Sequence, residues 1–239
     1  MKTTRSGLQN IFWTSVIGKA ATKFVPNIAV LIPMKTPCSA KSRLSGLFSV
    51  SQRGALVKNM LRRVLLAARG SSAQSVTVVG GGVNVRRIAS KYFAEWTASL
   101  GNDLNADLMD SIKARESEGF STIYLPGDLP FVQPIDIDTV IDASRQGTRL
   151  VLVPSSSDGG TSCMLIPSRN GFTTLLGHDS FNRHLKAARD MELESTVITP
   201  LGVSMDLDTE EDLIRCEELE PGFRARLAAP VIETGESDA

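Results

Sequence analysis

Short apolar runs typical of β-strands alternate with longer amphipathic segments from residue 28 onward, and this alternation constrains the fold most. The strand-like runs are 28–32, 76–79, 122–125, 150–153, 163–166, 196–198 and 203–207. Helical spacing of apolar residues marks 52–69, 85–100, 104–115, 135–144 and 181–191, and Thr209 begins a further helix. Strands that alternate with helices are typical of a parallel sheet covered on both faces. The pattern therefore predicts an α/β protein.

The predicted domain takes up most of the 239 residues, and a hydrophobic content of 42% suffices for one full core. We expect it to span residues 28–220, between an N-terminal extension of residues 1–27 and a loose tail of residues 221–239. The extension has no acidic residue and resembles an organellar transit peptide in composition. A short helix packed on the domain, or a poorly ordered tail, is the alternative that we favour.

Cysteine usage and hydropathy indicate a cytoplasmic protein. Cys38, Cys163 and Cys216 are odd in number and far apart in the sequence, without a Cys-x-x-Cys motif. Neither a zinc site nor a disulfide framework is therefore expected. No apolar run approaches the roughly 20 residues of a membrane helix, so we expect no membrane partner.

The formal net charge of zero conceals an uneven distribution. Residues 1–94 hold 15 of the 26 Lys and Arg residues and no Asp or Glu, whereas residues 95–239 hold all 26 acidic residues. Such asymmetry often indicates a nucleic-acid or membrane partner. Here the basic residues are spread over helix faces without interleaved aromatic side chains, so we expect no nucleic-acid partner. A basic part that binds a triphosphate and an acidic part that binds metal explain the distribution better.

Charged side chains of both signs follow the strand-like runs. Asp128, Asp206 and Asp208 come after apolar runs, and a loop with Lys35, Lys41 and Arg43 follows the first strand. A carboxylate at the end of a buried strand is costly unless a cation meets it. Carboxylates that hold magnesium, opposite cations that hold phosphates, are the equipment of phosphoryl or nucleotidyl transfer.

The glycine-rich segments exclude two common kinds of nucleotide-binding motif. The chain has neither a P-loop motif nor a Gly-x-Gly-x-x-Gly motif. The run 80–82 consists of three glycines, which let a flat ligand approach the backbone or simply form a turn. Residues 158–162 could form an anion pocket lined by backbone amides. The two histidines, His178 and His184, are interpreted as structural or exposed rather than catalytic.

Seven short motifs occur in the order found in the 2-phospho-L-lactate guanylyltransferases of coenzyme F-420 biosynthesis, and the chain resembles this family over about residues 28–220. The motifs are Ile32-Pro-Met-Lys35, Ala40-Lys-Ser-Arg-Leu44, Leu104-Asn105, Gly127-Asp-Leu-Pro130, Gly159-Gly-Thr161, Ser180-Phe-x-x-His184 and Asp206-Leu-Asp-Thr209. The resemblance implies a single-domain, three-layer α/β/α nucleotidyltransferase (GT-A-like) fold with a mostly parallel sheet of about seven strands.

The resemblance also implies residue roles. Metal ligands for Mg²⁺, with two ions expected, would be Asp128, Asp206 and Asp208. GTP would be bound by Pro33, Lys35, Lys41, Arg43, Gly80 and Asn105, of which Lys35, Lys41 and Arg43 would also stabilise the leaving pyrophosphate. The pocket for a small phosphorylated acid would contain Thr161, Gly177 and Ser180.

The sequence therefore predicts an enzyme that transfers GMP from GTP to 2-phospho-L-lactate, phosphoenolpyruvate or 3-phosphoglycerate. The partners implied are these substrates and a downstream transferase that accepts the unstable product, and a homodimer stays open. Two alternatives stay open as well. One is a molybdenum-cofactor or nucleotide-sugar transferase of the same fold, and the other is a non-catalytic nucleotide-binding protein.

Overall fold

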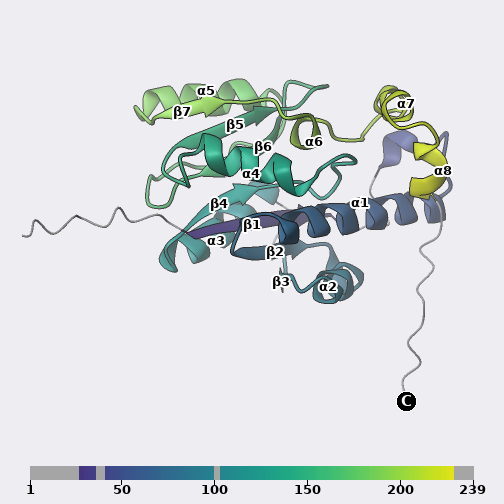
Figure 1. Cartoon of the computed structure of the whole chain (residues 1–239), viewed down its shortest axis with the longest axis horizontal. Helices are drawn as coiled ribbons and strands as arrows, with labels where there is room; N and C mark the ends of the chain where they lie inside the picture. The colour runs from purple at the N-terminus through teal and green to yellow at the C-terminus, as the bar shows by residue number, and fades with distance from the viewer. Residues whose placement is uncertain (1–26, 36–40, 100–102, 229–239) are drawn as a thin grey trace, which may run out of the picture.

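The computed structural model describes residues 27–35, 41–99 and 103–228, which form a seven-stranded sheet between layers of helices (Figure 1). The order across the sheet is β3-β2-β1-β4-β6-β5-β7. The strands are β1 (Asn27–Met34), β2 (Ser75–Gly80), β3 (Glu95–Thr97), β4 (Phe120–Tyr124), β5 (Leu150–Pro154), β6 (Thr161–Ile166) and β7 (Ser195–Val197). Only β6 runs antiparallel to its neighbours within this described sheet. The predicted α/β class and the mostly parallel sheet are confirmed.

Helices cover both faces of the sheet. Their bounds are α1 (Val50–Gly70), α2 (Gly82–Lys91), α3 (Leu104–Ser117), α4 (Pro134–Ala143), α5 (Ser180–Asp190), α6 (Leu201–Ser204), α7 (Glu210–Leu219) and α8 (Phe223–Ala228), with a short 3-10 turn η2 (Ser42–Leu44). Apolar side chains of α1, α2, α4 and α6 pack in one core cluster on the sheet. Those of α3 and α5 pack in a second cluster with other side chains of the same strands.

The central strand β1 ends at the edge of the sheet where the loops that carry the predicted site residues lie. Residues 29–32 are fully buried and entirely apolar, because β1 lies between β2 and β4 with helices over both faces. The parallel neighbours end at the same edge as β1. The antiparallel β6 begins there, and residues 155–160 connect it to β5 as a hairpin loop.

Two predicted elements are wrong. The helix expected over 85–100 ends at Lys91, and the chain then forms the edge strand β3, where the Trp96 indole donates a hydrogen bond of 2.8 Å to the Gly80 carbonyl. The strand expected over 203–207 is instead the end of α6 and an extended segment without strand pairing in the described sheet. Short apolar runs fit either kind of element, so tertiary packing decides between them.

Helix starts follow side-chain capping. The N-cap of α1 is Ser49, two residues before the expected cap at Ser51, and Ser49 forms a reciprocal capping box with Gln52. The predicted helix after Thr209 is confirmed, since Thr209 and Asp212 form the same kind of box at the start of α7.

The folded chain continues beyond the expected boundary at Pro221. In α8, Phe223 is buried and its ring lies 5.4 Å from that of Phe131, within a third apolar cluster that joins η2, α1 and α7. Figure 1 shows α7 and α8 side by side next to one end of α1. Residues 221–228 of the expected loose tail are therefore part of the described fold, whereas residues 229–239 and almost all of the expected N-terminal extension lie outside the described residues.

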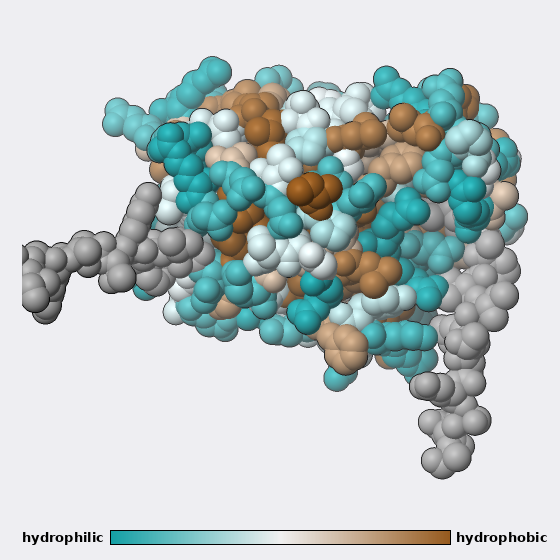
Figure 2. Space-filling view, in the orientation of Figure 1, coloured by the Kyte–Doolittle hydropathy of each residue, from teal (hydrophilic) through white to brown (hydrophobic). Residues whose placement is uncertain are grey.

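The described surface is predominantly hydrophilic on the face shown in Figure 2, where apolar side chains form small separate patches. Among the described helices, none combines the length and apolar character that crossing a bilayer requires. Cys163 and Cys216 are buried free thiols, while Cys38 lies outside the described residues.

Candidate active site

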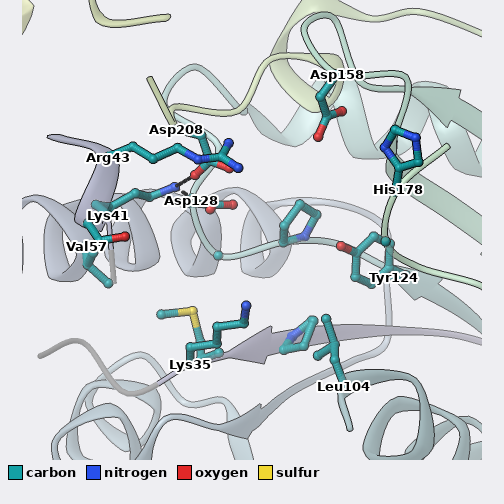
Figure 3. Close-up of a pocket in the computed structure, with 16 residues that line it drawn as sticks. Lys35, Lys41, Arg43, Val57, Leu104, Tyr124, Asp128, Asp158, His178 and Asp208 are labelled. Atoms are coloured by element: carbon teal, nitrogen blue, oxygen red, sulfur yellow. Dashed lines mark hydrogen bonds and ion pairs between the residues drawn. The ribbon is translucent and has the colours of Figure 1, made fainter. Parts of the chain in front are cut away.

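A cavity of about 700 Å³ opens at the edge of the sheet where β1 and β4 end (Figure 3). Its wall combines the end of β1, the turn before α1, the loop after β4, the β5–β6 hairpin and the loop before α5. The lining residues are Pro33, Met34, Lys35, Lys41, Ser42, Arg43, Val57, Leu104, Tyr124, Pro126, Gly127, Asp128, Asp158, Gly177, His178 and Asp208. Seven of the predicted site residues therefore line one cavity: Pro33, Lys35, Lys41, Arg43, Asp128, Gly177 and Asp208.

Lys41 forms the electrostatic centre of this cavity. Its ammonium nitrogen lies 2.6 Å from Oδ2 of Asp128 and 2.5 Å from Oδ1 of Asp208, and its side chain is only 4% exposed. Burial alone would lower the pKa of Lys41, but the charges of the two aspartates outweigh burial and raise it. The ammonium is therefore charged, and it joins loops that are 87 and 167 residues away in the sequence.

The third predicted ligand, Asp206, lies beside this pair but outside the residues that line the cavity. Burial, reinforced by the negative charges of Asp128 and Asp208, raises the pKa of Asp206 to about 6. The hydroxyls of Ser155 and Ser157 each donate a hydrogen bond of 3.5 Å to its carboxylate. The three predicted acids therefore share one electrostatic environment.

The carboxylate oxygens at this edge of the sheet are suitable ligands for a hard divalent cation such as Mg²⁺. Asp128 and Asp208 already direct one oxygen each at a single cationic group, the Lys41 ammonium. Among the described residues, no group of three acidic, thiol or imidazole side chains is arranged as a ready metal cage. Magnesium does not need such a cage, because it is usually held by one or two carboxylates together with substrate phosphates and water.

Two further cations face the same cavity. Lys35 follows β1 and Arg43 lies in η2, and Figure 3 shows Lys35 on the wall opposite Lys41 and Arg43. Pro33 ends the buried run of β1 and places Lys35 at the mouth. Cations on two walls form a suitable environment for a chain of phosphates.

Gly80 and Asn105 do not line the cavity in the described structure. Gly80 has a φ of +85°, and a Cβ there would lie 2.7 Å from the Met34 carbonyl oxygen, so this glycine permits the close pairing of β1 and β2. The Asn105 side chain accepts a 2.8 Å hydrogen bond from the Leu176 N–H and donates a 3.2 Å bond to the Leu176 carbonyl. Asn105 therefore fixes the loop that carries Gly177.

Thr161 and Ser180 are buried beneath the loops that border the cavity. The Ser180 hydroxyl accepts a 2.8 Å hydrogen bond from the Thr161 N–H. The Thr161 hydroxyl lies 2.7 Å from Nδ1 of His184, whose Nε2 accepts a 2.8 Å bond from the Leu175 N–H. Because Nε2 is an acceptor, Nδ1 carries the proton, and this N–H donates a hydrogen bond to the Thr161 hydroxyl oxygen. Burial, then the nearby charge of Arg183, lowers the pKa of His184 to about 4, so the ring is neutral.

Several lining residues were not among the predicted site residues. Tyr124 ends β4, and burial together with the Asp128 charge raises the pKa of its hydroxyl. Asp158 belongs to the glycine-rich hairpin that the sequence marked, and His178 follows Gly177. The position of Tyr124 at a strand end was an available signal, whereas His178 offered none.

A family model described as "Guanylyl transferase CofC like" matches residues 28–217, which is most of the chain. The chain belongs to this family. Its place in the CofC-like family agrees with the predicted resemblance, and the matched range contains every predicted site residue.

Curated relatives in the CofC-like family carry the names of three related enzymes. A phosphoenolpyruvate guanylyltransferase of Rubrobacter xylanophilus is 31% identical over 80% of this chain and 94% of its own length. A 3-phospho-D-glycerate guanylyltransferase of Phenylobacterium zucineum is 30% identical over 77% and 87%. A 2-phospho-L-lactate guanylyltransferase of Methanocaldococcus fervens is 29% identical over 77% and 82%. The protein is thus a nucleotidyltransferase.

Solved structures support the fold independently of sequence. A putative nucleotide-diphospho-sugar transferase from Desulfovibrio desulfuricans G20 has a TM-score of 0.66 at 15% identity, covering 84% of this chain and 92% of the other. The CofC-like chain therefore has the nucleotidyltransferase fold that the resemblance implied.

Proposed function

We propose that this protein transfers GMP from GTP to the phosphate of a small phosphorylated carboxylic acid, with release of pyrophosphate, in coenzyme F-420 biosynthesis. The observation that carries the proposal is the cavity in which Lys35, Lys41 and Arg43 face the carboxylates of Asp128 and Asp208. This charge arrangement suits phosphoryl and nucleotidyl transfer in general. Membership of the CofC-like family and the names of the curated relatives support guanylyl transfer in particular.

The proposed chemistry needs charge neutralisation more than proton transfer. An oxygen of the acceptor phosphate forms a bond to the α-phosphorus of GTP, and the bond from that phosphorus to the β-bridging oxygen breaks. The acceptor phosphate is already anionic, so no general base is required. Mg²⁺ held by Asp128 and Asp208, with Asp206 beside them, would neutralise charge on the phosphates. Lys35 and Arg43 stabilise the negative charge that collects on the departing pyrophosphate.

The acceptor is proposed to bind between the β5–β6 hairpin and the loop before α5. Gly177 and Asp158 face the cavity there, and Thr161 and Ser180 fix these loops from below. We therefore propose that Thr161 and Ser180 act on the acceptor side of the cavity as positioning residues. Their direct contact with the acid remains a prediction. The relatives named above suggest phosphoenolpyruvate as the first acid to test, followed by 3-phosphoglycerate and 2-phospho-L-lactate.

The decisive experiment measures pyrophosphate release with GTP and Mg²⁺ for each of these acids and for 2-phosphoglycerate. ATP and CTP in place of GTP test base selectivity, and EDTA tests the metal. Arg43→Ala should weaken GTP binding by about 10-fold or more, since a charge-assisted contact contributes about 1.5–3 kcal/mol. Arg69→Ala, which removes an exposed charge at the end of α1, is the matched control. Absence of pyrophosphate release with every acid would refute the proposal.

A further inference from the structure

The cation between the two carboxylates of the site belongs to the protein itself. The Lys41 ammonium lies within 2.6 Å of an oxygen of both Asp128 and Asp208, as the dashed lines in Figure 3 show. Both contacts are charge-assisted hydrogen bonds, which are among the strong ones in proteins. Asp128 and Asp208 remain 31% and 42% exposed, so they face the cavity while the lysine beneath them is almost fully buried.

Lys41 and a metal ion compete for these carboxylates. Two cations that share the same pair of carboxylates repel each other at close range. A buried ammonium that loses both partners keeps an uncompensated charge, which is strongly destabilising. Binding of a free divalent ion at Asp128 and Asp208 therefore carries the additional cost of displacing Lys41.

A nucleotide removes this cost, because Lys41 also lines the cavity in which the phosphates are proposed to lie. Lysine is a compact charge on a flexible stem, so its ammonium can exchange a carboxylate for a phosphate oxygen by rotation of that stem. The backbone of Lys41 has a φ of 57°, which is uncommon for a residue with a side chain. Arg43 lines the same cavity but forms no ion pair with a carboxylate in the described part of the chain.

We propose that Lys41 is the resident counter-ion of the metal-binding carboxylates and couples metal binding to nucleotide binding. While the nucleotide is absent, Lys41 weakens the binding of free metal. When phosphates enter, they provide Lys41 with a new partner and leave the carboxylates free for the metal. The inference rests on the proposed function in that Asp128 and Asp208 hold the metal. It predicts that metal and nucleotide bind with positive cooperativity.

The test measures Mn²⁺ affinity by calorimetry without nucleotide, on wild type and five variants. Lys41→Met and Lys41→Gln keep the length of the side chain to a large degree and remove its charge, and each should bind Mn²⁺ about 10-fold more tightly. Lys41→Arg keeps a competing cation and should stay close to wild type. Arg69→Met removes an exposed charge in the last turn of α1, outside the residues that line the cavity, so it should also leave the Mn²⁺ affinity unchanged.

Three outcomes separate the two proposals. The counter-ion role is supported if Mn²⁺ binds more tightly in the two uncharged Lys41 variants and in no other variant. In these two variants Mn²⁺ should also raise the melting temperature more than it does in wild type, which shows that the ion binds folded protein. Unchanged or weaker affinity in those variants, with loss of binding in Asp208→Asn, overturns the role and leaves the metal site intact. Unchanged binding in Asp208→Asn overturns the metal assignment itself.

Discussion

Replacement of His184 by phenylalanine should remove one pH-dependent part of the stability of this protein. The imidazole is fully buried, donates from Nδ1 to the Thr161 hydroxyl and accepts the Leu175 N–H at Nε2. Its ring lies 5.8 Å from that of Phe172, so an aromatic replacement fits the surroundings. A proton added at Nε2 would oppose the Leu175 N–H and place an uncompensated charge in the core.

The sign and size of the effect follow from the two pKa values. The pKa of His184 is about 4 in the folded protein against an ordinary value of 6.5, so the unfolded chain takes up the proton first as the pH falls. The stability from the neutral ring is present above pH 6.5 and is lost as the pH falls from 6.5 to about 4. Linkage gives a loss of about 2 kcal/mol between pH 7 and pH 5.

Urea unfolding of the metal-free protein at several pH values measures this loss. His184→Phe should be less stable than wild type at pH 7, because Thr161 and Leu175 lose a partner, yet the difference should shrink by about 2 kcal/mol at pH 5. The raised pKa of Asp206 acts with the opposite sign, but it is present in both proteins and cancels. His178→Asn serves as the exposed control. Parallel pH curves for wild type and His184→Phe would refute the reasoning.

Three further predictions test other parts of the structure. Asp208→Asn should abolish turnover. In metal-free buffer it should also lower the free energy of unfolding by about 1–3 kcal/mol, because Lys41 loses one charged partner. Equal or higher stability of the variant in urea unfolding would contradict this. Asn105→Ala should raise the Michaelis constant for the acid more than that for GTP, because it releases the loop before Gly177; an effect on GTP alone in steady-state kinetics would place the loop on the other substrate. Phe223→Ala should lower the free energy of unfolding by about 3–5 kcal/mol in urea unfolding, as truncation of a buried core aromatic does. A loss under 1 kcal/mol would show that α8 is not part of the cooperatively folded domain.

The central part of the fold could be predicted from sequence because burial on both faces leaves an unmistakable pattern. Residues 28–32 of β1 are apolar at every position, and such runs are typical of interior strands of a parallel sheet. The edge was harder to predict. The three-residue strand β3 has one half-buried and two exposed side chains, so its one apolar residue, Trp96, resembled the end of a helix. Pairing with β2 decides its conformation, and pairing is not visible locally.

Within the candidate site, the sequence predicted residue types better than contacts. Strand ends indicated that acids and basic residues would converge, and the cavity contains most of them. The bond of Lys41 to two acids spans 87 and 167 residues, which no local pattern reports. Thr161 and Ser180 were predicted as ligand contacts, whereas their hydroxyls are engaged with His184 and with backbone below the cavity. A polar residue beside a glycine does not reveal which way its side chain points.

The antiparallel hairpin of β5 and β6 is a separable structural element beside the proposed acceptor position. Its loop, residues 155–160, connects two strands that are already paired, and the Ser155 N–H closes it by donating a 2.9 Å hydrogen bond to the Gly160 carbonyl. Residues can be inserted or exchanged in such a loop without shifting the register of β1, β2 and β4, which carry the basic turn and Asp128. With the acceptor bound as proposed, exchange of this loop should change the acid that is recognised and leave the proposed nucleotide chemistry unchanged. A chimaera that carries only the hairpin loop of a relative with another acceptor is the corresponding engineering route.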